Sequence, residues 1–243
     1  MFLAGFYGDD AAWKRVAKEW PETLGPQRQH LHMNRLRFER ESERQMLERA
    51  AQVPRNCGLV PILGGVRRSD YRDLFIANPA WHLMNGYVVC LWSMLFDTLR
   101  GLPSGERLEV VFEEQERFSG FAQEAIKVLV QGNPPEELLL PDGRPKLASW
   151  RWVPKGSTSL LEPADYLCFA LSKFHREYGS VKQKWSYPIM RGQEGEGFGF
   201  ILQRDDARKA FANAPNDSVE EMDRVDVKGG VNVVHCGGAK VGQ

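Results

Sequence analysis

Apolar residues recur along the chain at two spacings, one typical of helices and one typical of strands. Trp13, Val16, Ala17 and Trp20 form the apolar face of a helix. Asp9 or Asp10 can cap this helix, and we expect it to end at Pro21. Similar spacing predicts further helices over 39–53, 81–101, 118–132 and 160–174. Short apolar runs predict strands over 2–8, 58–68, 107–115 and 145–156.

Strands alternate with helices from residue 58 onward, which predicts an α/β fold with a mixed or parallel sheet flanked by helices. We expect this domain to span residues 1–187. The segment 188–243 is rich in glycine and lacks amphipathic order, so we expect a weakly structured C-terminal extension there.

The charge and cysteine content restrict where this chain acts and what it binds. The 32 basic and 32 acidic residues give no net charge, which argues against broad wrapping of nucleic acid but leaves room for a local basic groove. The four cysteines are far apart in sequence, as expected for a reducing cytoplasm. The uncharged run 81–96 is too short to span a bilayer, and we expect no membrane association.

Two acids, Glu113 and Glu114, end the strand predicted over 107–115. Ligands of open α/β sheets bind beyond the carboxyl ends of strands, so one of these acids can serve a site. Acids at a strand end are also commonly just solvated, and the sequence leaves both readings open.

The helix predicted over 160–174 carries Glu162 and Asp165 in its first turn. The helix dipole favours negative charge there, which explains both acids without any function. Asp165 also borders the apolar stripe of the helix, however, where a carboxylate is usually paired, capping or bound to a metal.

Other polar groups give weaker indications. His30 and His32 alternate and could share one face of a strand, but a metal site would need a third ligand from elsewhere. Trp150 and Trp152 are interleaved with the basic residues Arg151 and Lys155, a pattern that can stack bases. The more common arrangement places such tryptophans in the core and the arginine in water.

Four stretches in this order resemble the family called domain of unknown function 3800: "FLAGFYGDDAAWKRVAKEW", "HLHMNRL", "VVFEEQERF" and "LLEPADYLCFAL". The resemblance covers about residues 2–187 and implies a ribonuclease H-like fold. Such folds gather carboxylates around divalent ions. It further implies that Glu113 and Asp165 are catalytic metal ligands, with Glu114 as a substitute for Glu113 and Glu162 as an additional acid nearby.

Oxygen ligands of this kind select Mg²⁺ or Mn²⁺. The resemblance therefore implies a metal-dependent nuclease, or a related phosphodiester-processing protein, with nucleic acid as its partner.

The chain departs from the family at its start, because Met1 leads directly into what would be the second strand. The family's first strand, which carries an acidic "D-E/D-S-G" motif, is missing or truncated, either through a late start codon or through loss. The alternative function is thus a non-catalytic ribonuclease H-like module that binds nucleic acid or a protein. That alternative predicts an exposed sheet edge at residues 2–8.

Overall fold

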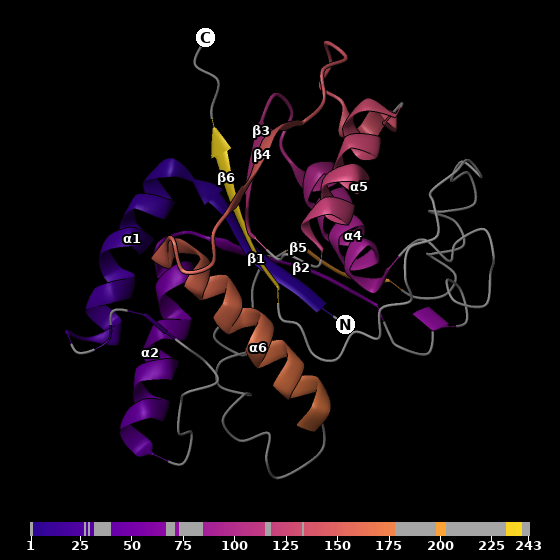
Figure 1. Ribbon diagram of the computed structural model, residues 1–243. Coiled ribbons are helices and arrows are strands. Elements are labelled where there is room, and N and C mark those ends of the chain that lie inside the picture. The colour runs from indigo at the N-terminus through magenta and orange to yellow at the C-terminus, as the bar shows by residue number, and fades with distance from the viewer. Residues whose placement is uncertain are drawn as a thin grey trace.

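The computed structural model of the protein shows three layers, with one central sheet between two layers of helices (Figure 1). It describes residues 2–26, 28, 30–31, 40–66, 71–72, 85–114, 118–132, 134–177, 198–202 and 232–239. For 172–177, 198–202 and 232–239 it describes the backbone alone. The predicted α/β class, with a mixed sheet flanked by helices, is confirmed.

Six strands form the sheet, in the order β4-β3-β6-β1-β2-β5. Their bounds are β1 Phe2–Asp9, β2 Val60–Val66, β3 Arg107–Glu113, β4 Leu147–Val153, β5 Phe198–Leu202 and β6 Asn232–Ala239. The pairs β1–β6, β2–β5 and β3–β4 are parallel, whereas β1–β2 and β3–β6 are antiparallel. The last strand in sequence therefore occupies the middle of the sheet.

The helices follow the sequence pattern closely. They are α1 Asp10–Leu24, α2 Glu41–Asn56, α4 Gly86–Gly101, α5 Ser119–Gln131 and α6 Glu162–Glu177, with short 3-10 turns at Glu136–Leu138 (η4) and Ser159–Leu161 (η5). Asp9 caps α1 by accepting a hydrogen bond from the Ala12 N–H at 2.7 Å, as predicted. The expected end of this helix at Pro21 is wrong, since α1 continues to Leu24 and closes at Gly25.

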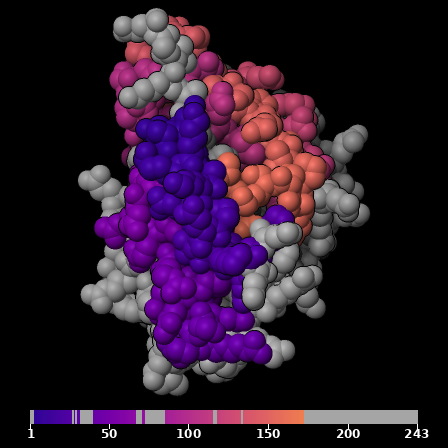
Figure 2. All heavy atoms as spheres, turned by 90° about the vertical axis from the view of Figure 1, so that its left-hand side faces the viewer, coloured from indigo at the N-terminus to yellow at the C-terminus, as the bar shows by residue number. Residues whose placement is uncertain are grey.

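Each face of the sheet has its own apolar core. On one face α4 and α5 pack against alternate residues of the strands, among them Leu3, Leu108 and Phe112. On the other face α1, α2 and α6 pack against Ala4 and Phe6. Figure 2 shows α1 and α2 side by side on this second face, with the segment leading into α6 against α1.

The strand β1 has neighbours on both of its edges, so the exposed edge predicted at residues 2–8 is absent. Tyr7 lies opposite Val60 of β2 and Cys236 of β6. The division of the chain at residue 187 remains a prediction, but β5 and β6 come from beyond it and belong to the same sheet. No helix in the described part of the chain combines the length and apolar character needed to cross a bilayer.

Gly64 of β2 lets helix α4 approach the sheet closely. A Cβ atom at this position would lie 2.1 Å from the Cys90 carbonyl oxygen and 2.8 Å from the Met94 Cβ. Both atoms belong to a buried helix and the nearer one is backbone, so they cannot move aside without shifting α4.

We therefore expect Gly64→Ala to lower the free energy of unfolding by about 2–4 kcal/mol through overpacking. The matched control is Gly120→Ala in α5, where an added Cβ meets nothing within 4 Å. That control should be neutral or stabilising by about 0.5 kcal/mol. Urea denaturation of both variants measures the difference, and equal stability of the two would contradict the close approach.

Candidate functional site

The strands β3 and β4 run parallel and end at the same edge of the sheet. Glu113 is the last residue of β3 and lies opposite Val153, the last residue of β4. The Glu114 N–H donates to the Val153 carbonyl at 2.7 Å, which fixes the two strand ends together. Glu113 is partly buried, whereas Glu114 is exposed.

Alternation along β3 determines the direction of Glu113. Leu108, Val110 and Phe112 all belong to the core under α4 and α5. Glu113 therefore projects from the opposite face of the sheet, where α6 packs against β1 and β6. The Glu113 side chain and helix α6 therefore lie on the same side of the sheet.

Asp165 lies in the first turn of α6 and is partly buried. The pKa of Asp165 is raised from its ordinary 3.8 to about 6, mainly by burial and next by the negative charge of Glu113. Glu162 adds to this effect, while the positive charge of Lys155 opposes it. Glu113 and Lys155 therefore both lie near enough to Asp165 to alter the pKa of its carboxyl group.

The Glu162 carboxylate, which was also expected near the site, interacts with groups from other segments of the chain. Its Oε2 accepts hydrogen bonds from the Trp20 indole N–H at 2.8 Å and from the Leu31 N–H at 3.1 Å. Its Oε1 lies 2.8 Å from the His30 Nδ1. This carboxylate therefore joins α1, the segment at residues 30–31 and the start of α6.

The histidines give no metal site within the described residues. His30 interacts with Glu162, while its predicted partner His32 lies outside the described residues, as does His82. No group of three His, Cys, Asp or Glu side chains in the described ranges is placed to hold a metal ion. The strand β6, next to Glu113 on β3, contains neither Asp nor Glu.

The tryptophans of β4 follow the common arrangement rather than a base-stacking one. Trp150 and Trp152 pack against the core on the α4–α5 face, and Trp152 stacks on Phe112 with ring centroids 4.4 Å apart. Arg151 is exposed on the other face.

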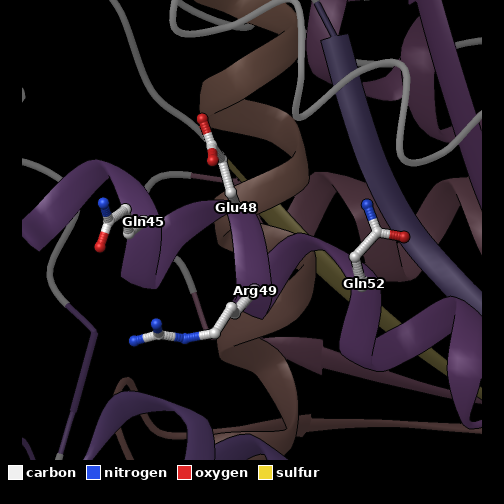
Figure 3. A pocket seen from close by; sticks show the side chains of 4 residues that line it. All are labelled: Gln45, Glu48, Arg49 and Gln52. Atoms are coloured by element: carbon white, nitrogen blue, oxygen red, sulfur yellow. The ribbon is translucent and has the colours of Figure 1, made fainter. Parts of the chain in front are cut away.

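The surface also has a depression on α2, lined by Gln45, Glu48, Arg49 and Gln52 (Figure 3). All four side chains come from the outer face of a single helix, and none of them affects the pKa of Asp165. This depression therefore has no part in the carboxylate site.

Sequence reasoning missed the proximity of Lys155 to Asp165 and the central position of β6. Lys155 follows β4 by two residues, so the parallel pairing of β3 with β4 could have placed it beside Glu113 had the register been known. No periodicity in residues 232–239 indicates a central strand.

Comparisons with protein-family models, with curated proteins and with solved structures found no match for this chain. The resemblance to domain of unknown function 3800 therefore remains a prediction that rests on the four sequence stretches.

The raised pKa of Asp165 has a measurable consequence for stability. The unfolded chain loses this proton near pH 3.8 and the folded chain near pH 6, so stability falls as the pH rises through that window. We expect Asp165→Asn to gain about 2–3 kcal/mol relative to the wild type between pH 4 and pH 7. Urea denaturation at both pH values measures this gain. The exposed control Asp142→Asn, whose pKa is lowered by Arg144, should show no such gain.

Loss of the Glu162 carboxylate should destabilise the fold. Glu162→Ala leaves the buried Trp20 indole N–H without its acceptor, so we expect a loss of about 2–3 kcal/mol in the free energy of unfolding. Glu22→Ala, at an exposed position of α1, provides the control and should change stability by less than about 0.5 kcal/mol. A neutral Glu162→Ala variant would contradict the anchoring role of this carboxylate.

Proposed function

We propose that the protein is a divalent-metal-dependent nuclease, or a related phosphodiester-processing protein, with a ribonuclease H-like fold. The observation that carries this proposal is the electrostatic interaction of Glu113 with Asp165, two carboxylates that lie 52 positions apart in the sequence. They lie on the same side of the sheet, at the carboxyl end of β3 and in the first turn of α6.

The donor set fits a hard cation. Two nearby carboxylates repel each other, and a bound cation would relieve both this repulsion and the burial penalty on Asp165. Mg²⁺ is commonly held by one or two carboxylates, with water and substrate phosphate completing its shell. Glu113 and Asp165 would supply those carboxylates, while Glu114 is exposed beside them and Glu162 is already engaged.

A bound Mg²⁺ or Mn²⁺ would supply positive charge to a phosphodiester and to an attacking water. Glu113 and Asp165 would hold that charge at the sheet edge. The partial burial of Asp165 limits access of bulk water, which strengthens its interaction with a cation.

We expect the wild type to cleave a fluorescently labelled oligonucleotide in the presence of Mg²⁺ or Mn²⁺ and not in EDTA. Asp165→Asn and Glu113→Gln should each reduce the cleavage rate by at least about 100-fold, since each removes an anionic ligand. Glu114→Gln is the matched control and should retain the wild-type rate. Cleavage by Asp165→Asn at the wild-type rate would show that the activity resides elsewhere or in a contaminant.

One observation favours a second candidate, the non-catalytic module. The strand that fills the sheet position between β1 and β3, β6, has the sequence NVVHCGGA and brings no carboxylate to the site. Binding of an oligonucleotide without metal-dependent cleavage would support this alternative over the nuclease.

A further inference from the structure

The face of β3 and β4 that carries Glu113 also presents exposed polar side chains. By alternation, Glu109, Ser149 and Arg151 lie on this face, opposite the side on which Trp150 and Trp152 join the core. All three are exposed, whereas Val111, which lies on the same face opposite Arg151, is buried. The part of the face that is open to solvent therefore runs along Glu109, Ser149 and Arg151.

Two cations lie on this open face. Arg151 is opposite Val111 in the sheet, and its guanidinium group makes no ion pair or hydrogen bond with any side chain or backbone group that the structure describes. Lys155 is exposed and near enough to Asp165 to lower the pKa of that carboxyl group. Arg151 and Lys155 are four positions apart in the sequence, so their Cα atoms are at most about 14 Å apart.

Lys155 is held by a defined turn. The Ser157 N–H donates to the Pro154 carbonyl at 3.0 Å, and Gly156 has a φ of 71°. Residues 154–157 thus form a hydrogen-bonded β-turn in which Lys155 takes the second position. The backbone that carries Lys155 is thus fixed next to the end of β4.

We propose that this open face of β3 and β4 binds a single nucleic-acid strand, with Arg151 and Lys155 contacting successive backbone phosphates and leading the strand to Glu113 and Asp165. This inference deepens the proposed function and rests on it for the choice of ligand. The positive charges complement phosphates, and arginine suits their bidentate geometry. Two positively charged side chains near the end of β4 match the single line of phosphates in one nucleic-acid strand better than the two backbones of a duplex.

Glu109 carries the opposite charge on the same face, so its removal should have the opposite effect on binding. It lies on the same face, opposite Ser149, and is exposed. A phosphate chain passing along β4 toward Asp165 would meet this negative charge near Arg151. Removing Glu109 should therefore tighten binding, whereas removing the cations should weaken it.

The experiment measures fluorescence anisotropy of labelled 12-nucleotide DNA and RNA strands in EDTA, with the full chain, between 50 and 200 mM salt. We expect Arg151→Ala and Lys155→Ala each to weaken binding about threefold to tenfold at low salt and to reduce the salt slope by about 0.7 per lost phosphate contact. Glu109→Gln should tighten binding about twofold to threefold. The matched control is Arg100→Ala at the exposed end of α4, the helix on the other side of the sheet, and it should leave affinity unchanged.

Binding of either DNA or RNA with this pattern supports the proposal, and the comparison between them identifies the sugar that is preferred. Absence of binding, or equal losses for Arg151→Ala and Arg100→Ala, overturns it. Because EDTA removes divalent ions, the binding assay is independent of cleavage. Binding without cleavage rejects the nuclease and keeps the surface, whereas cleavage that is insensitive to Arg151→Ala and Lys155→Ala rejects the surface and keeps the nuclease.

Discussion

The insertion of β6 between β1 and β3 is the interaction on which this architecture depends. In the described part of the chain, β1, β2 and β5 form one set of paired strands and β3 and β4 form another, and β6 alone joins them. Val234 lies opposite Gly5 on one side and Phe112 on the other. Both cores draw residues from both sets, so the backbone hydrogen bonds of β6 hold the two sets in the register that the helices require.

The same strand sets the geometry of the candidate site. Glu113 belongs to β3, on one side of β6, while Asp165 belongs to α6, which packs against β1 and β6. The distance between the two carboxylates thus depends on β6, a strand that contains no acidic residue. Within the first turn of α6, Glu162 and Asp165 have opposite roles: Glu162 is anchored by three groups, whereas Asp165 has a raised pKa and faces Glu113 and Lys155.

The sequence predicts those parts of the fold that local patterns determine. The apolar residues Met46, Leu47, Ala50 and Ala51 are buried in α2 as their spacing indicates, and β3 ends at Glu113 within the predicted segment. The end of α1 was predicted wrongly at Pro21. A proline near a helix end removes one backbone hydrogen bond, and the burial of Trp20 and Leu24 outweighs that loss. The position of β6 and the proximity of Lys155 to Asp165 arise from long-range pairing, which no local pattern encodes.

Binding and cleavage make different demands on this surface. A phosphate chain needs only exposed cations in a fixed arrangement, and Arg151 and Lys155 meet that demand without any metal. Cleavage needs anionic ligands close enough to share a cation, and each carboxylate added there raises the cost of the empty site, as the pKa of Asp165 shows. A site with two carboxylates beside a central strand that has none carries a smaller cost than a site with three, at the expense of weaker metal binding. Under the proposed function, the charge balance of this sheet edge therefore determines whether the site can hold a cation for cleavage or only binds nucleic acid.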